Sequence, residues 1–374
     1  MTQETSNKSR FLSKTQGIVF LTTILTFLLK AWSRSHPETV EKWYTNGFYD
    51  GVRWVFDLLT GWLPFAFIYL VFCALLVLII VRVKKWWAIP SWKSKLLKAS
   101  TGVVTLLAVL YTSFTWLWGF NYEKTSFSQK HQLQTIEIAD SILFQDLEEL
   151  SFRLSEKRQS LGLPDSITWD MLPRDLDYRV RSALNDGLSM MGYDPKGKLR
   201  AKLLHPRGSL LRISTAGIFL PFSGEGHVDP GLHPIMIPFV MAHEMSHAQG
   251  FTNEGVCNFV AYHTMSHSVD PLLSYCGSMG YFRYLASQCR RMDVSWYKTF
   301  FENLDPLVKN DLIHISAYSR KYPDILPKLR DLTYDTYLKA QGIQDGMKSY
   351  NTVVRLHYQW QRNQEVKRET INLE

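Results

Sequence analysis

Three long apolar stretches lie in the first third of the chain and limit where that part of it can go. They cover residues 18–32, 62–81 and 102–120. A helix of about 20 apolar residues matches the hydrocarbon thickness of a bilayer. Buried helices of a soluble fold usually keep a polar face, which these stretches lack. We therefore expect three transmembrane helices within a membrane anchor that covers residues 1–120.

The first stretch also fits the hydrophobic core of a signal peptide. We see no convincing small-residue cleavage site after it, so we expect a retained anchor. The third stretch ends in an aromatic cluster at 114–120, and such clusters are typical of the membrane surface.

Basic residues beside the apolar stretches indicate the orientation of the anchor. They are Lys8, Arg10 and Lys14 before the first stretch, and Arg82, Lys84, Lys85, Lys93, Lys95 and Lys98 between the second and third. In the connection between the first and second, basic residues are diluted by acidic ones. The positive-inside rule then places the N-terminus and the 82–98 loop in the cytoplasm. We expect a multi-pass protein of the cell membrane (the inner membrane of a bacterium), with residues 121–374 on the extracytoplasmic side.

The net charge of +8 does not indicate a nucleic-acid partner. Much of the excess flanks the apolar stretches, and the sequence has no zinc-finger spacing, no aromatic RNA-binding signature and no long basic run. The expected partners are the lipid bilayer and a peptide or protein substrate.

Cys73 lies in an apolar stretch, whereas Cys257, Cys276 and Cys289 lie further on without C-x-x-C spacing. We expect free thiols, with a Cys276–Cys289 disulfide as the alternative.

Residues 121–374 have the length of one domain and predict a mostly helical α+β fold. Helical patterns cover 129–159, 174–191, 235–248, 253–268, 272–289, 293–304, 307–319, 326–341 and 347–360. The segment 209–222 is rich in β-branched and apolar residues, with a glycine and a proline, and predicts one or two short strands. We expect 215–225 to form the edge strand of a small sheet, where an extended peptide can bind by β-augmentation.

The sequence His243-Glu244-Met245-Ser246-His247 is an H-E-x-x-H motif within the helical stretch 235–248. Two histidines four residues apart lie on one helix face and can bind a single metal ion. Glu244 then lies beside the open position of the metal, where it can take a proton from a zinc-bound water. The motif also arises by chance in unrelated helices, so a third ligand decides its meaning.

Two patterns compete for that third ligand. The metzincin pattern has its turn glycine at Gly250 but places Asn253, a poor zinc ligand, at the third histidine. In the gluzincin pattern a glutamate follows on the next helix, and residues 253–258 resemble the Asn-Glu-x-x-Ser-Asp stretch of thermolysin-like peptidases. Glu254 is therefore our third zinc ligand, and Asn258 takes the place of the carboxylate that accepts the N–H of a zinc-bound histidine. The short interval between His247 and Glu254 requires a tight turn, which Gly250 can supply.

An oxyanion needs a further hydrogen-bond donor beside the zinc. The sequence offers His227, Tyr262, Tyr281, Arg283 and Tyr350 without singling one out. His263 and His267 also lie four residues apart, but they lack the intervening glutamate, and a packing or solvent role is expected. His205 and His233 are expected in loops.

Several segments resemble a bacterial membrane-anchored group catalogued as domain of unknown function 3810 and regarded as zincin-like. They are residues 118–122, 217–225, 243–259, 337–342 and 346–350. Members of the group usually have Glu-x-Glu-Ala-Asn where this chain has Glu254-Gly-Val256-Cys-Asn258, so the second glutamate is replaced by Val256. The resemblance implies a gluzincin-like metallopeptidase and leaves the substrate open.

These observations predict a membrane-anchored zinc metallopeptidase that hydrolyses peptide bonds outside the cytoplasm. Zinc is expected on His243, His247 and Glu254, with Glu244 as general base. Two alternatives stay open: a zincin-like envelope protein without catalysis, and an amidase that acts on cell-wall peptide cross-links. The sequence does not indicate an oligomeric state.

Overall fold

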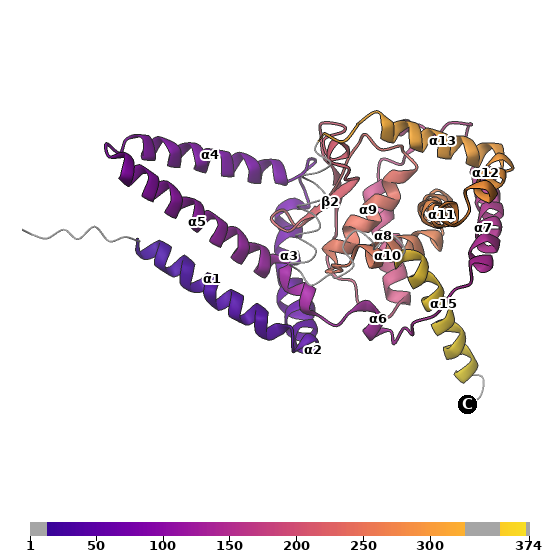
Figure 1. Ribbon diagram of the computed structural model, residues 1–374, viewed down its shortest axis with the longest axis horizontal. Coiled ribbons are helices and arrows are strands. Elements are labelled where there is room, and N and C mark those ends of the chain that lie inside the picture. The colour runs from indigo at the N-terminus through magenta and orange to yellow at the C-terminus, as the bar shows by residue number, and fades with distance from the viewer. Residues whose placement is uncertain (1–12, 326–351, 372–374) are drawn as a thin grey trace, which may run out of the picture. The chain divides into compact units, whose positions relative to one another are not determined.

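A computed structural model describes residues 13–325 and 352–371, which form two compact units (Figure 1). The first unit combines the described residues of Met1–Val52 with Phe67–Lys124. The second combines Arg53–Ala66 with the described residues of Thr125–Glu374. The chain is mostly helical, and the second unit holds a three-stranded sheet.

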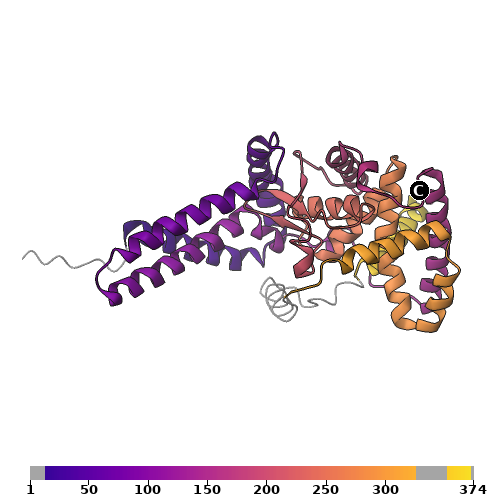
Figure 2. The same cartoon turned by 90° about the horizontal axis from the view of Figure 1, so that it is seen from above.

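Three long helices run side by side in the first unit: α1 (Lys14–Ser33), α4 (Ile68–Trp87) and α5 (Trp92–Leu117) (Figures 1 and 2). Between α1 and α4 the chain forms α2 (Pro37–Thr39), the π-helical η1 (Val40–Phe48) and α3 (Tyr49–Thr60). A 3₁₀ helix, η2 (Gly119–Glu123), follows α5.

Two of the described helices, α1 and α5, are long and apolar enough to cross a membrane, whereas the sequence predicted three such helices. The predicted span at 62–81 is wrong in its bounds. The chain around Pro64 is not helical, and α4 begins only at Ile68 and continues to Trp87. Any 18-residue stretch of α4 therefore contains Arg82, Lys84 and Lys85, more charge than such a stretch usually carries into a bilayer. A signal sequence near the N-terminus has the same properties as α1.

The third predicted span, 102–120, is also displaced along the sequence. α5 begins at Trp92, so most of the predicted 82–98 loop is helical, and it ends at Leu117, before the extended φ of −162° at Trp118. Side-chain hydrogen bonds link α1 to α5, a common means of pairing membrane helices. They join Gln16 to Thr105 (3.2 Å), Thr23 to Thr112 (2.9 Å) and the Trp116 indole N–H to Thr26 (3.0 Å).

The second unit is built around two helices, α9 (Met236–Ala248) and α10 (Glu254–Ser266), which pack against each other (Figure 1). The surrounding helices are α6 (Phe127–Lys130), α7 (Asp140–Ser160), α8 (Leu176–Met190), α11 (Pro271–Met292), α12 (Val294–Glu302), α13 (Pro306–Arg320) and α15 (Thr352–Ile371). Two short 3₁₀ helices are η3 (Trp169–Met171) and η4 (Leu211–Ile213).

Most of the helices predicted for this unit are confirmed to within a few residues. The continuous helix predicted at 129–159 is wrong, because α6 ends at Lys130 and Gln132 adopts a left-handed φ of 54°, which a helix cannot continue through. The predicted helix 326–341 and the first part of 347–360 lie outside the described residues, and α15 is described from Thr352 onward.

The sheet contains β1 (Ala201–Leu203), β2 (Gly217–Leu220) and β3 (Glu225–Val228) in the order β1-β3-β2. β1 runs parallel to β3, whereas β2 is antiparallel to β3 and pairs Ile218 with His227. The edge strand predicted within 215–225 is confirmed as β2. The strands β1 and β3 were not predicted, because runs of three and four residues show too little alternation to be recognised.

The core of the second unit joins the inner faces of α7 to α11. It contains a fully buried ion pair in which Arg158 Nε donates to Asp311 Oδ2 over 2.7 Å. The Tyr275 hydroxyl donates to the same oxygen over 2.6 Å, so α7, α11 and α13 share one polar contact. Cys257, Cys276 and Cys289 are buried free thiols, and Cys73 is an exposed one.

Candidate metal centre

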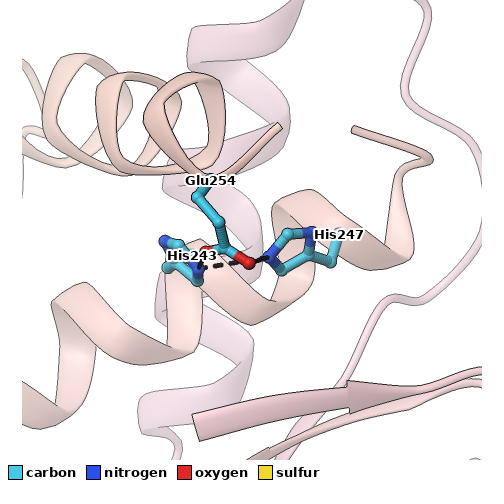
Figure 3. A group of neighbouring side chains, drawn as sticks. All are labelled: His243, His247 and Glu254. Carbon is cyan, nitrogen blue, oxygen red and sulfur yellow. Dashed lines mark hydrogen bonds and ion pairs between the residues drawn. The ribbon is translucent and has the colours of Figure 1, made fainter. Parts of the chain in front are cut away.

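The H-E-x-x-H motif occupies the last turns of α9, a helix that the core surrounds. Every residue of α9 is buried except His243. His243 and His247 lie on the side of α9 that faces the start of α10, as their spacing predicts (Figure 3). Because the rest of the helix is packed, the positions of both imidazoles are set by the core.

A glycine turn brings the third residue of the cluster to the two histidines. Gly250 has a φ of +93°, the Gly250 N–H donates to His247 O over 2.9 Å, and the Phe251 N–H donates to Ser246 O over 3.2 Å. These two bonds form a Schellman motif, which ends α9 and reverses the chain. Asn253 then caps α10 by accepting from the Val256 N–H over 3.1 Å. Glu254 is the first residue of α10 and is held opposite α9.

The side chains of His243, His247 and Glu254 converge on one point (Figure 3). His243 Nε2 lies 3.2 Å from His247 Nε2 and 3.1 Å from Glu254 Oε2, and His247 Nε2 lies 3.5 Å from Glu254 Oε1. Side-chain exposure is 13% for His243, 9% for His247 and 32% for Glu254, so the cluster opens to solvent on the side of the carboxylate.

This donor set fits a tetrahedral zinc ion. Ligand atoms about 2.0–2.1 Å from a tetrahedral zinc lie about 3.3–3.4 Å from one another. The two histidine Nε2 atoms lie 3.2 Å apart, close to that value, and each lies near one of the two Glu254 oxygens, His243 3.1 Å from Oε2 and His247 3.5 Å from Oε1. Two imidazoles and a carboxylate are also the ligand types of a catalytic zinc site, which keeps its fourth position for water or substrate.

Hydrogen bonds behind the cluster orient both imidazoles. His243 Nδ1 lies 2.8 Å from Asn258 Oδ1 and donates to this amide oxygen, as the sequence predicts for a metal ligand. His247 Nδ1 lies 2.8 Å from the Phe251 carbonyl oxygen, which belongs to the glycine turn. With Nδ1 held by these bonds, each Nε2 is turned to the centre and is the atom that would bind a metal ion once the imidazole is neutral.

Glu244 lies between α9 and the sheet, with 3% exposure. The Phe219 N–H of β2 donates to its carboxylate, and its Oε2 atom is buried without a hydrogen bond within the described residues. Two strand glycines make room for it. A Cβ at Gly217 would lie 2.6 Å from Glu244 Oε1, and a Cβ at Gly226 would lie 2.6 Å from Glu244 Cβ. The sheet can approach this carboxylate only because both positions lack a side chain.

Burial and mutual attraction set the charges of the centre. Burial raises the pKa of Glu244 to about 7, against the opposing effect of the two nearby imidazoles. Burial also opposes the charge on Glu254, but His247 and His243 outweigh it and hold the pKa of Glu254 well below its usual range. Glu254 is therefore an anion at neutral pH and serves as an anionic ligand. Burial raises the pKa of Cys257, which lies 3.4 Å from His247, and keeps this thiol neutral.

The predicted oxyanion donors occupy several different places. His227 lies on β3 next to Gly226, and the alternation of a strand turns it away from Glu244 and toward Ser223, 3.0 Å away. Burial lowers the pKa of His227 to about 4. Tyr262 and Tyr281 stack on each other with ring centroids 4.1 Å apart.

The other residues singled out by the sequence have different partners or lie beyond the described residues. Arg283 contacts the Met236 sulfur at the start of α9 over 3.5 Å, and Tyr350 lies outside the described residues. His263 stacks on Phe259 within the packing between α10 and α15. His233 is buried and faces Tyr318 of α13.

Sequence reasoning missed three features of the site: the glycines Gly217 and Gly226, and the Phe251 carbonyl. Glycine inside a strand is a known sign of close backbone approach, so the two glycines carried a usable signal. A backbone carbonyl as the partner of His247 carries no side-chain signal at all.

A family model described as "Protein of unknown function (DUF3810)" matches residues 44–358, which include every residue of the cluster. No curated protein and no solved structure matches the chain. The match covers most of the sequence, so the chain belongs to the DUF3810 family.

Proposed function

We propose that this protein is a zinc-dependent hydrolase of peptide bonds. The observation that carries the proposal is the convergence of His243, His247 and Glu254, with both histidine Nε2 atoms near each other and near the Glu254 carboxylate, and with Glu244 beside them under the edge strand. Zinc held there would supply a Lewis acid that polarises the peptide carbonyl and makes water more acidic.

Glu244 is the proposed general base. Its position against β2 holds it beside the cluster, and its pKa of about 7 lets it gain and lose a proton near neutral pH. Its Oε2 atom makes no hydrogen bond within the described residues, and we assign this oxygen to take the proton from the attacking water. The same oxygen then returns the proton to the nitrogen of the leaving amine.

The edge strand β2 is the proposed binding site for the peptide. β2 pairs with β3 along one side only, because it lies at the edge of the described sheet. An extended peptide can pair along its other side by β-augmentation. Since Phe219 of β2 donates to Glu244, a peptide on this strand passes close to the general base.

We further propose that α1, α4 and α5 cross a membrane with the second unit outside the cytoplasm, and that the basic end of α4 lies at the cytoplasmic surface. The length and apolar character of α1 and α5 support the anchor. A crossing by α4 is needed because α3, which precedes it, and the second unit contact each other and so lie on the same side. The side is supported by the distribution of lysine and arginine between 82 and 98.

Metal content and hydrolysis, measured on the purified full chain, test the proposal. Inductively coupled plasma mass spectrometry gives the metal, and a peptide library that includes cell-wall cross-link peptides gives the activity. We expect about one zinc per chain in both the parent and Glu244→Gln, with hydrolysis slowed about 10²–10⁴-fold in the variant. Glu302→Gln, at an exposed position on α12, is the matched control and should leave both unchanged. A hydrolysis rate in Glu244→Gln equal to that of the parent would contradict the role of Glu244 as general base. A zinc-loaded parent that cleaves nothing would favour the non-catalytic alternative, and cleavage of cross-link peptides alone would favour the amidase.

A further inference from the structure

Helix α3 buries polar side chains and exposes apolar ones, the reverse of a helix on the surface of a soluble domain. The polar side chains of its second half, which belongs to the second unit, face residues 196–198 of the same unit. Arg53 is buried and donates to the Lys196 carbonyl over 2.5 Å, and Asp57 accepts from the Lys198 N–H over 2.6 Å. Thr60 is also buried. These contacts hold the second half of α3 against the segment that leads into β1.

The apolar side chains of the same segment face away from the protein. We call this set the outer face; it consists of Trp54, Val55, Leu58, Leu59, Trp62 and Phe65. The first four follow one stripe of the helix. Exposure reaches 66% at Trp54, 63% at Leu58 and 75% at Trp62. Soluble monomers rarely leave so many large apolar side chains together in water, so the outer face has a partner.

A lipid bilayer is the partner that suits the outer face best. The segment lies in the chain between two apolar helices, α1 and α4, so it cannot move far from any membrane that holds them. Its two tryptophans are the residues that gather at the boundary between headgroups and acyl chains. Asp57 is the sole charged residue in 54–65 and faces inward. The exposed Lys196 and Lys198 are next to the inward face and suit an anionic surface.

We propose that the outer face lies in the interfacial layer of a lipid bilayer, with α3 lying along the membrane surface. An amphipathic helix binds there by burying its apolar face just below the headgroups while its polar face stays outside the acyl layer. In α3 the polar face is occupied by the second unit itself. The helix therefore fixes one side of that unit to the lipid.

This placement has a consequence for the candidate metal centre. The turn between β2 and β3 packs on α3, because a Cβ at Gly224 would lie 2.4 Å from the Phe56 ring. The edge strand β2 runs from that turn to Glu244, which Phe219 contacts. Only a few residues of strand therefore separate the membrane side of the unit from the centre. If the proposed hydrolase function holds, which this step requires, the substrates are peptide segments close to the bilayer surface.

Spin labels on the full chain in liposomes of zwitterionic and anionic lipid test the proposal. The background is Cys73→Ser, because Cys73 is exposed and the three other cysteines are buried. Single labels are placed at Leu58→Cys and, in a separate protein, at Trp54→Cys. The matched control is Val269→Cys, at a fully exposed apolar position between α10 and α11. Collision rates are measured with oxygen, which concentrates in lipid, and with a water-soluble nickel chelate.

We expect the ratio of oxygen to nickel collisions at Leu58 and Trp54 to exceed that at Val269 by at least several-fold. Nickel access at Leu58 and Trp54 equal to that at Val269 would overturn the proposal. Shielding of both labels from both reagents would also overturn it, because a protein surface would then cover the outer face. The collision rates do not depend on catalysis, so this test is separate from the test of the hydrolase function. Labels in lipid on a protein without hydrolase activity would support the membrane placement of α3. Labels in water on an active protein would refute that placement and leave the hydrolase function standing.

Discussion

Asn258 gives the most informative single perturbation of the centre, because it touches the cluster without being a metal ligand. Its side-chain oxygen lies 2.8 Å from His243 Nδ1 and is largely buried. In Asn258→Ala the imidazole N–H loses its acceptor in a place with little access to water. An unsatisfied buried donor costs about 1–3 kcal/mol, which corresponds to about 5- to 150-fold in affinity. Loss of a group that hydrogen-bonds a metal ligand typically weakens metal binding about 10- to 100-fold, in agreement with this range.

Competition with a zinc-binding dye measures this change on the detergent-solubilised full chain. Asn258→Ala should raise the zinc Kd about 10- to 100-fold. Asn258→Asp should retain or tighten binding, because a carboxylate is a stronger acceptor for the same N–H. Asn310→Ala, at a position on α13 where the side chain bonds Asp165 O, is the matched control and should leave the Kd unchanged. An unchanged Kd in Asn258→Ala would refute the orienting role, and a similar loss in both Asn258 variants would point to a general disturbance of the site.

Three further predictions concern stability, each measured by thermal unfolding of the full chain. Gly226→Ala places a Cβ 2.6 Å from the Glu244 side chain and should lower the free energy of unfolding by about 1–3 kcal/mol. Gly51→Ala is the control, because a Cβ there has nothing within 4 Å and should not destabilise the protein. Equal melting temperatures for the two variants would contradict the close approach of the sheet to Glu244. Asp311→Ala leaves the fully buried Arg158 charge without its partner and should cost about 3–5 kcal/mol, so a loss below about 1 kcal/mol would mean that the pair contributes little. Burial lowers the pKa of His357 to about 3, whereas an unfolded histidine titrates near 6.5. Below pH 6.5 the unfolded chain binds a proton that the folded chain does not, so stability should fall between pH 7 and pH 4, and the fall should be smaller in His357→Gln.

The cluster could be predicted from the sequence because its geometry is local. His243 and His247 are joined by one turn of helix, and a single glycine turn brings Glu254 to them within seven residues of His247. Each step follows from spacing and from the backbone freedom of Gly250, with no need for distant parts of the chain. Asn258 could be inferred for the same reason, since it is one turn beyond Glu254 on α10.

Features that depend on distant contacts were missed or displaced. The apolar content of 62–81 was evident, but the helix that forms there starts after Pro64 and takes in Arg82, Lys84 and Lys85. The inward-facing polar side of α3 could not be predicted, because the groups that satisfy Arg53 and Asp57 are backbone atoms more than a hundred residues away. Hydropathy shows which residues are apolar, but tertiary partners decide which face of a helix is exposed.

X-ray absorption at the zinc edge, measured on the purified full chain, shows whether His243, His247 and Glu254 hold zinc. We predict one zinc per chain with two imidazole nitrogens and carboxylate oxygen at about 2.0–2.2 Å. Substitution of Glu254 by alanine should remove the carboxylate contribution and most of the metal. A spectrum with sulfur at about 2.3 Å, which would implicate Cys257, or zinc uptake that is unaffected in the alanine variant, would contradict the centre described above.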